Sequence, residues 1–380
     1  MNLKNLTKEL ENLLDFWLHI VLTENQRELA SEVSINGTAN TDSNMGSMYL
    51  ARIIYGASIA CKTLKTDKYK ILADVAYKNL ISKFKNPKGG FYWAIEKYGT
   101  ITHDAENINM AQAFVLYGLA EYVSLNKQAE VELITQSKFI IETLIDKENS
   151  GFIDGFDKNW KQTDNRTKAL GTHIHLLEAF TKHYEYNNNN RLIPVIEYLI
   201  TIIIDKLYVP ETKEFLHRTT PNWEALPNEN WAGHNAEVSW ILCKSASTIK
   251  SDVLIKKCNA LAIEIMDKVC DVAFDKTQGG VFNVIEHDKP TENVKIWWPQ
   301  AETTIGLLNA YQISKNKDYL VKAQEQMGYI SKHFIHESGE WYTELKLDNT
   351  PSLNQPLVFF WKSMYHTVRY YVELLENLKE

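Results

Sequence analysis

The chain has 380 residues, of which 44% are hydrophobic and 23% charged, and its formal net charge is −7. This composition is typical of a globular protein, and the acidic balance without a basic tract argues against nucleic acid as a partner. Aromatic residues reach 11%, with 10 Trp and 19 Tyr, so some of them are available to line a binding site.

No feature of the sequence indicates export or a membrane span. The N-terminal residues are charged and helical in pattern, without the apolar core of a signal peptide, and apolar runs such as 192–204 are too short to cross a bilayer. The cysteines are scattered without a C-x-x-C pair, which favours free buried thiols in a reducing compartment. They are Cys61, Cys243, Cys258 and Cys270. We therefore expect a cytoplasmic protein with no membrane contact.

Amphipathic helical patterns follow one another along the whole chain, and strand patterns are nearly absent. This alternation predicts an all-α fold. The segments expected to be helical are 4–22, 47–64, 68–84, 106–124, 128–145, 172–186, 190–206, 234–249, 252–270, 298–314, 317–334 and 360–378.

A short signature recurs between these helices. It reads Gly89-Gly90-Phe91-Tyr92, Gly151-Phe152, Glu214-Phe215-Leu216, Gly279-Gly280-Val281-Phe282 and Gly339-Glu340-Trp341. From Gly90 through Gly151, Glu214 and Gly280 to Glu340 the intervals are 61, 63, 66 and 60 residues, and a further period back falls near Arg27, where the signature is degraded. Because one period holds one helix hairpin, we expect six hairpins that close into an (α/α)6 barrel, a single domain over residues 1–380.

Ionisable residues fall at a similar depth in five of these units. Polar loops follow the signatures and lead into the next helix, so they should meet at one end of the barrel, where a rigid scaffold gathers its binding residues. Each residue lies 20 to 26 positions after the signature of its own unit, a phase that surface residues have no reason to keep. The five are Arg52 (counted from Arg27), His175, His234, Glu302 and His366.

Each of these residues also has a purely structural interpretation. His234 and Glu237 share one helix face at the start of segment 234–249, and taken alone they fit a solvated surface pair as well as a proton-transfer pair. A carboxylate at Glu302 follows an apolar stretch, where it is costly without a partner, and an arginine in the apolar run around Arg52 needs an anionic partner or ligand.

The remaining candidates divide in the same way. His366 fits a core histidine as well as a site residue. In Thr172-His173-Ile174-His175 two histidines alternate, and only one of them can face the lumen of the barrel. Trp298 and Trp361 fit a core or a sugar-stacking platform.

Two other kinds of site compete with proton transfer. A metal centre built from His175, His234, Glu237 and His366 lacks any compact ligand spacing. A glycosidase needs two carboxylates, for which Glu237 and Glu302 are available, but that chemistry does not use three histidines.

Several segments of the chain resemble the cellobiose 2-epimerases, within the wider N-acylglucosamine 2-epimerase superfamily of (α/α)6 barrels. The likeness runs from about Arg52 to the C-terminus. The segments are Gly233-His234-Asn235-Ala236-Glu237-Val238-Ser239-Trp240, Trp297-Trp298-Pro299-Gln300-Ala301-Glu302, Phe360-Trp361-Lys362-Ser363-Met364-Tyr365-His366, Thr172-His173-Ile174-His175, and Gln112-Ala113-Phe114 with Tyr117-Gly118-Leu119.

The resemblance implies a sugar epimerase that acts at C2 of a reducing-end glucose or mannose through ring opening and an enediolate. It implies a sugar as partner and no metal or nucleotide cofactor, and it leaves the oligomeric state open. The implied roles are acid–base catalysis by His234 and His366, assistance of ring opening by His175, orientation of the histidines by Glu237 and Glu302, binding of the O1/O2 region by Arg52, and ring stacking by Trp298 and Trp361.

The chemistry is consistent with those roles. Imidazole titrates near neutral pH and acts as either acid or base, so two histidines on opposite inner helices suit removal and return of the C2 proton. The chain departs from the family pattern at Gly171 and Met110, and it lacks a Gly-Gly-Phe pattern before Arg52. These departures concern the sugar-facing surface, so a free hexose 2-epimerase, an aldose–ketose isomerase and a non-catalytic sugar-binding barrel are the alternatives.

Overall fold

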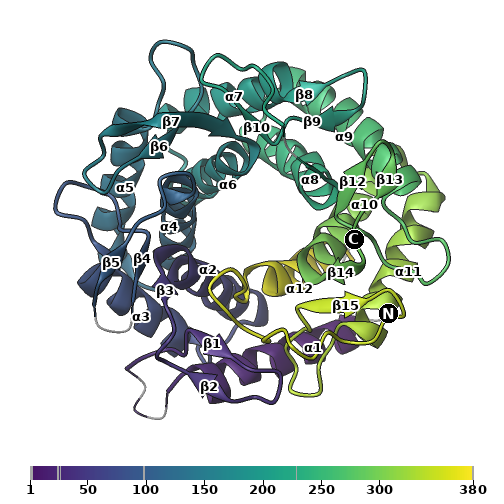
Figure 1. Cartoon of the computed structure of the whole chain (residues 1–380), viewed down its shortest axis with the longest axis horizontal. Helices are drawn as coiled ribbons and strands as arrows, with labels where there is room; N and C mark the ends of the chain where they lie inside the picture. The colour runs from purple at the N-terminus through teal and green to yellow at the C-terminus, as the bar shows by residue number, and fades with distance from the viewer. Residues whose placement is uncertain (1–2, 24, 26, 97–98, 228, 379–380) are drawn as a thin grey trace.

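Helices make up most of the computed structural model, which describes residues 3–23, 25, 27–96, 99–227 and 229–378. Within these residues twelve α-helices form two concentric rings (Figure 1). The inner ring consists of α2 (Ser47–Leu64), α4 (Ile108–Tyr122), α6 (Leu170–Asn187), α8 (Ala232–Thr248), α10 (Trp297–Ser314) and α12 (Tyr365–Asn377). The outer ring consists of α1 (Leu3–Phe16), α3 (Lys70–Asn79), α5 (Glu130–Thr143), α7 (Ile193–Ile202), α9 (Asp252–Val272) and α11 (Lys317–His333).

Both rings close through contacts between the two ends of the chain. Each inner helix packs against the next, and α12 packs against α10 on one side and α2 on the other. The outer helices α3, α5, α7, α9 and α11 each pack against the inner helix that precedes them, whereas α1 packs against α12. The expected (α/α)6 architecture is confirmed.

The two rings differ in how their surfaces are buried. Every residue of α2 from Ser47 to Cys61 is buried, and a helix that is covered all round requires neighbours on every face. In α1 the buried residues follow a stripe that includes Leu6, Leu10 and Leu13, with charged residues between them. That spacing of three and four is one face of an α-helix, so α1 belongs on the outside.

Helix boundaries follow the predicted segments except at a few ends. The last helix begins at Tyr365 and not near residue 360, because Phe359 and Lys362 pair across a tight turn. Short irregular helices extend several others: π-helical turns at Trp17–Val21, Leu80–Phe84 and Ile203–Leu207 follow α1, α3 and α7, and 3-10 turns at Lys127–Ala129 and Asn190–Leu192 precede α5 and α7.

Fifteen short strands in the described residues were not predicted. Most have only two or three residues, too few for a period of two to be visible in the sequence. They are β1 (Glu32–Val33), β2 (Ala39–Asn40), β3 (Met45–Gly46), β4 (Ala94–Ile95), β5 (Ile101–Thr102), β6 (Asp154–Phe156), β7 (Gln162–Ala169), β8 (Tyr208–Val209), β9 (Glu214–Phe215), β10 (Arg218–Thr219), β11 (Asn230–Trp231), β12 (Val284–Glu286), β13 (Lys289–Pro290), β14 (Val294–Ile296) and β15 (Glu344–Lys346).

All of these strands lie between the end of an outer helix and the start of the next inner helix, and therefore at one end of the barrel (Figure 1). They form six small antiparallel sheets, in the orders β1-β2, β3-β4-β5, β10-β7-β6, β8-β9, β11-β12-β13 and β14-β15. Several sheets join neighbouring units: Arg218 pairs with Ala169, and Trp231 with Val284. The strands thus tie the loops of adjacent units together above the inner helices.

The same loops hold the N-termini of inner helices. At four of them the first N–H of the helix donates to a backbone carbonyl just after the signature of the following unit, which satisfies a group that the helix itself leaves unpaired. The pairs are Ser47 with Trp93, Leu170 with His217, Ala232 with Asn283, and Trp297 with Thr343. Because these hydrogen bonds join neighbouring units, they hold the N-termini of the inner helices at a similar height along the barrel axis.

The cysteines and the helix lengths agree with the sequence analysis. All four cysteines are free thiols, and Cys61, Cys243 and Cys258 are buried. Within the described residues, none of the helices combines the length and the apolar character that crossing a bilayer requires.

Candidate active site

A cavity of about 470 Å³ opens at the N-terminal ends of the inner helices. This volume lies in the range of pockets that bind small molecules. Seven of the eight residues singled out from the sequence line it, and the eighth, Glu302, is fully buried behind His366. The seven are Arg52, His175, His234, Glu237, Trp298, Trp361 and His366.

The helix starts explain why residues so far apart in the sequence meet. Helices α2, α6, α8 and α10 begin at Ser47, Leu170, Ala232 and Trp297, so Arg52, His175, Glu237 and Glu302 are each five residues into their helix. The same number of residues from aligned starts gives the same height and the same direction. His234, Trp298 and His366 lie in the first turn of α8, α10 and α12, closer to the mouth.

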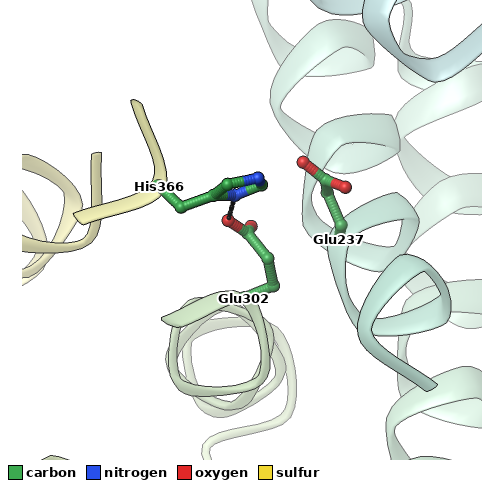
Figure 2. Close-up of side chains that lie close together, drawn as sticks. All are labelled: Glu237, Glu302 and His366. Carbon is green, nitrogen blue, oxygen red and sulfur yellow. Dashed lines mark hydrogen bonds and ion pairs between the residues drawn. The ribbon is translucent and has the colours of Figure 1, made fainter. Parts of the chain in front are cut away.

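His366 is paired with a buried carboxylate. Its Nδ1 lies 2.7 Å from Oε1 of Glu302, as Figure 2 shows. Burial, followed by the charges of Arg369 and Arg52, lowers the pKa of His366 well below its usual value. Burial, and then Glu237 and Glu178 as like charges, raises the pKa of Glu302 to about 8 although Arg369 opposes this. The pair therefore keeps a shared proton up to mildly alkaline pH.

Arg369 lies at the centre of a buried ionic network below the cavity. Its Nη2 donates to Oε1 of Glu237 at 2.5 Å and to Oε1 of Glu302 at 2.6 Å, and its Nη1 donates to Oε1 of Glu178 at 2.6 Å. The hydroxyl of Tyr365 donates to Oε2 of Glu178 at 2.6 Å. Three carboxylates thus share one guanidinium, and their charges raise the pKa of Arg369 further above its usual value even though burial opposes this.

This network changes the partner that the sequence suggested for Glu237. We expected Glu237 to orient His234, three residues before it on α8. Instead Oε1 of Glu237 accepts from Arg369, and Oε2 has no hydrogen-bond partner among the described residues. The physical reason is that a buried guanidinium needs a carboxylate far more than a neutral imidazole does. Glu302, in contrast, does contact a histidine, as expected.

Among the described residues, one cluster of side chains offers potential metal ligands, and it consists of Glu237, Glu302 and His366. Ligand atoms of Glu237, Glu302 and His366 lie within 4.8 Å of one another. The guanidinium of Arg369 already bonds to both carboxylates of this group. It supplies the positive charge that a metal ion would bring, so the residues present do not call for one.

His234 has a second histidine as its neighbour. Its Nδ1 lies 3.3 Å from Nδ1 of His217, with the two rings nearly parallel at 19°. Nε2 of His217 accepts the backbone N–H of Trp231 at 3.1 Å. Burial lowers the pKa of His217 to about 3, and burial followed by His217 lowers the pKa of His234 well below its usual value. Both rings are neutral at physiological pH.

Arg52 supplies a fixed positive charge on the cavity wall. Its Nη1 donates to the backbone carbonyl of Trp361 at 2.9 Å, and its guanidinium lies 4.1 Å from the centre of the Phe114 ring. Burial lowers its pKa to about 10, so it remains charged at neutral pH. Its Nε is buried and has no hydrogen-bond partner among the described residues.

The two neighbouring histidines of α6 separate as expected. His175 lines the cavity, with Nδ1 3.5 Å from Oε2 of Glu178. His173 points the other way and holds the signature loop, because its Nε2 accepts the backbone N–H of Phe152 at 3.0 Å. Burial lowers the pKa of His173 to about 4, so this ring is a neutral structural element.

Aromatic rings form the remaining walls. The ring of Trp298 lies between the two histidines, with centroid distances of 5.0 Å to His234 and 5.6 Å to His366. Trp361 is 40% exposed at the mouth. Gly171 and Met110 also line the cavity, and a Cβ at Gly171 would meet no atom within 4 Å except Sδ of Met110, at 3.7 Å. This part of the wall is therefore roomy and apolar.

The helices that carry the histidines are not opposite one another. We expected His234 and His366 to face each other across the barrel, but α8 and α12 both pack against α10 and are separated by that one helix (Figure 1). A group bound over Trp298 is thus flanked by the two imidazoles. Three functional neighbours escaped the sequence analysis: His217, Tyr365 and Arg369.

Comparisons with known proteins show what this chain is similar to. A family model described as N-acylglucosamine 2-epimerase (GlcNAc 2-epimerase) matches residues 31–369. A relative from Dictyoglomus turgidum, named cellobiose 2-epimerase, is 28% identical over 400 residues and the match covers 100% of both chains. Another, from Ruminococcus albus and with the same name, is 25% identical over 99% of this chain and 98% of its own.

Solved structures show the same fold. A sugar epimerase from a ruminal bacterium superposes with a TM-score of 0.91 at 23% identity, covering 99% of both chains. A cellobiose 2-epimerase from Bacillus thermoamylovorans superposes with a TM-score of 0.89 at 24% identity, covering 98% of both chains.

Proposed function

Because this chain belongs to the N-acylglucosamine 2-epimerase family, we propose that it is a sugar 2-epimerase that inverts C2 of the reducing-end residue of a β-1,4-linked disaccharide such as cellobiose or lactose. The observation that carries the proposal is one cavity in which His234 and His366 flank Trp298, with Arg52 on the same wall. The names of the relatives support a disaccharide as the substrate class, and the residues of the cavity support proton transfer at C2.

Inversion at C2 begins with the open-chain aldehyde, because only a neighbouring carbonyl makes the C2 hydrogen acidic. A histidine removes that proton, and the electrons of the C2–H bond form the C1–C2 double bond of an enediolate. A proton returned to the opposite face of C2 gives the epimer, and ring closure completes the cycle. Imidazoles are suited to both steps because they exchange protons near neutral pH.

The enediolate is an anion, so the site must favour negative charge. Arg52 contributes a fixed cation on the cavity wall. The six inner helices also direct their N-terminal ends toward the cavity, and each carries a partial positive charge there. Charges and dipoles that are in place before the reaction stabilise the transition state without reorganisation.

Ring opening requires a proton for the ring oxygen and removal of the proton from the O1 hydroxyl. His175 is a cavity-lining imidazole outside the Trp298 pair, a type of side chain that can act as a general acid or base. Glu178 lies behind its Nδ1. Glu178 in turn is held by Arg369 and Tyr365. Burial alone would raise its pKa, but Arg369, His175 and Tyr365 together lower it to about 2. An ionised carboxylate at this place favours the charged form of His175 when it takes a proton.

A substrate with two rings fits the mouth of the cavity. Trp361 lines the cavity on one side and, on the other, a second and more open hollow that includes Trp93, Asn44 and Asp104. An exposed aromatic face beside polar groups is a usual platform for a sugar ring. We assign the reducing-end ring to the position over Trp298 and the second ring to the side of Trp361.

The carboxylates do not favour a glycosidase. Glu237 and Glu302 both bond to Nη2 of Arg369, and Glu302 does not line the cavity. A glycosidase instead needs two carboxyl groups on either side of the scissile oxygen.

The experiment is incubation of the protein in D2O with cellobiose, lactose, mannose and glucose, followed by NMR of each sugar. We expect deuterium at C2 and the C2 epimer as product, with the disaccharides turned over faster than the hexoses. Faster turnover of mannose or glucose would move the substrate class to a free hexose. A ketose as the main product would make the enzyme an isomerase, and no exchange into any of the four sugars would overturn the proposal.

A further inference from the structure

The contact between His217 and His234 determines which nitrogen of His234 carries the proton. The backbone N–H of Trp231 can only donate, so the atom that receives it, Nε2 of His217, has no proton. Since His217 is neutral, its single proton is on Nδ1. That N–H lies 3.3 Å from Nδ1 of His234, which must therefore accept. Neutral His234 then carries its own proton on Nε2.

The geometry supports a directed chain of hydrogen bonds and not a chance approach of two rings. The planes of His217 and His234 are inclined by only 19°, with centroids 5.2 Å apart, and their two Nδ1 atoms lie 3.3 Å from each other. Trp231 and Trp298 pack on His234 at centroid distances of 5.1 and 5.0 Å and hold its orientation. The carbonyl of His217 accepts the first N–H of α6, which fixes the backbone that carries this histidine.

The same contact disfavours a charged His234. An imidazolium has two N–H donors, and its Nδ1–H would point at the N–H of His217. His217 could accept it only by moving its proton to Nε2, where the N–H of Trp231 already lies. Other groups around this end of the cavity add positive charge, negative charge or a further imidazole. They are Arg52 on α2, His175 on α6, Glu237 on α8 itself, Glu302 on α10, His366 on α12, and Glu106, Arg218 and Glu229 at the mouth.

His366 has the opposite kind of partner. Its Nδ1 faces a carboxyl oxygen of Glu302, which once ionised accepts an N–H and stabilises the imidazolium that forms when Nε2 takes up a proton. We propose that His217 is a positioning residue that fixes neutral His234 in the tautomer protonated at Nε2, so that His234 meets the sugar as a hydrogen-bond donor and His366 is the base that first removes the C2 proton. The second half of this statement rests on the proposed epimerase function.

In that step the lone pair on Nε2 of His366 takes the C2 proton, and the C2–H electrons form the C1–C2 double bond. The aldehyde oxygen becomes the enediolate oxygen. His366 gains one positive charge and the sugar one negative charge, and Nε2–H of His234 is available to bond to the new oxyanion. A neutral imidazole that donates to a developing enediolate is an established catalytic device in other enzymes.

The test uses full-length protein labelled with 15N-histidine in three forms: wild type, His217→Gln and His217→Leu. A glutamine amide reproduces both roles of His217, with its oxygen accepting from Trp231 and its NH2 donating to His234. Leucine removes both. The ring nitrogens of His234 are assigned by comparison with His234→Gln, and their shifts report the tautomer and the pKa directly.

We expect the wild type and His217→Gln to show His234 protonated at Nε2 with a bare Nδ1. In His217→Leu we expect a mixture of tautomers and a rise of about one unit in the pKa of His234, since one hydrogen bond contributes about 0.5–1.5 kcal/mol and one pKa unit corresponds to about 1.4 kcal/mol. A wild-type His234 protonated at Nδ1, or an unchanged tautomer in His217→Leu, would overturn the proposal.

The kinetic arm separates this proposal from the proposed function. With the sugar that gives C2 exchange in D2O, kcat should fall about tenfold in His217→Leu and by less than about threefold in His217→Gln. Equal losses in both variants would contradict the role of the hydrogen-bond chain. If no sugar exchanges at all, the epimerase proposal fails and the base assignment of His366 fails with it, whereas the tautomer of His234 is still decided by the NMR result.

Discussion

His366 and His234 line the same end of one cavity and flank the same tryptophan, yet their Nδ1 atoms meet opposite partners. Nδ1 of His366 lies against the carboxylate of Glu302, which is joined to an arginine and two further carboxylates. Nδ1 of His234 lies against neutral His217, which is joined to a backbone N–H. Two chemically identical side chains are thereby prepared for different roles, one to gain a proton and one to donate a hydrogen bond.

The difference indicates that the hydrogen-bond partner of an imidazole determines whether it acts as a base or as a hydrogen-bond donor. Burial lowers the pKa of both histidines. Only His366 has a group that compensates for a positive charge when it appears. Substitutions of the two histidines and of their neighbours test this difference.

The largest effect is expected from replacing the histidines themselves. His366→Gln should lower kcat about 10³–10⁴-fold and abolish deuterium incorporation at C2, because proton transfer by a positioned side chain contributes up to about 10⁴-fold. His234→Gln should lower kcat about 10²–10³-fold and retain slow incorporation, because the base remains. The measurement is NMR of the sugar in D2O. Equal loss of exchange in both variants would contradict the division of roles.

Removal of the arginine below His366 should destabilise the fold. Arg369→Met leaves Glu178, Glu237 and Glu302 buried without their shared cation, which should lower the free energy of unfolding by about 3–5 kcal/mol. Urea denaturation measures this. The control is Arg218→Met, which removes a less buried ion pair with Glu106 at the mouth and should cost no more than about 1 kcal/mol. Similar losses in the two variants would show that the network is not a major stabilising element.

The two carboxylates on Arg369 should differ in their effect on catalysis. Glu302→Gln removes the charged partner of His366 and should lower kcat about 10–100-fold, since a hydrogen bond to a charged group contributes about 1.5–3 kcal/mol. Glu237→Gln removes the negative charge of a residue that bonds to Arg369 and not to a histidine, and it should lower kcat by less than about tenfold once the fraction of folded protein is matched. A larger loss in Glu237→Gln would restore the pairing with His234 that the sequence suggested.

The pH dependence should report the shared proton of His366 and Glu302. The folded pKa of Glu302 is about 8, above that of an unfolded glutamate. Below that value the pair holds its extra proton and His366 is not a base, so kcat/KM should rise with pH with its midpoint near 8 and level off at higher pH. In Glu302→Gln this rise should move to lower pH.

Stability should show the same linkage with the opposite trend. Because the pKa of Glu302 is raised on folding, the stability that comes from this shift is fully present below about pH 4.3 and is lost as pH rises through 8. Urea denaturation of the wild type and Glu302→Gln across pH 4–9 tests this. Parallel curves for the two proteins would contradict it.

The smallest effect is expected at the exposed edge of the cavity. Trp361→Ala removes the ring shared by the two hollows and should raise KM for the disaccharide about 2–12-fold, from an aromatic contribution of about 0.5–1.5 kcal/mol. KM for a hexose should change less, because a single ring occupies the position over Trp298. Initial rates with cellobiose and mannose compare the two, and equal changes would place the second ring elsewhere.

Much of this architecture was predictable from contiguous stretches of sequence. The signature repeated every 60 to 66 residues predicted the hairpins. The similar distance of 20 to 26 residues from the signature to Arg52, His175, His234, Glu302 and His366 predicted a shared cavity, which all of them except Glu302 line. Both predictions depend on periodicity, which a helix of 3.6 residues per turn converts directly into height and direction. The strands were not predictable in this way, because two or three residues carry no period.

Two of the missed residues left a signal that was not used. Arg369 follows His366 by three residues in an apolar helix, and the argument that a buried arginine needs anionic partners applied to it as well as to Arg52. His217 comes directly after the signature Glu214-Phe215-Leu216, in a loop assigned to the cavity end of the barrel. Neither signal identifies the contact that the residue makes.

The sequence by itself determined the helices, their order and most of the candidate residues that face the cavity, because these follow from interactions between residues that are near one another along the chain. The tertiary structure alone decided the pairs: Glu302 with His366, Glu237 with Arg369, and His217 with His234. Each pair joins different elements, and its choice depends on competition among acceptors for one buried guanidinium and among donors for one ring nitrogen. Such competition is settled by distances of a few ångströms between side chains that the sequence places 17 to 132 residues apart.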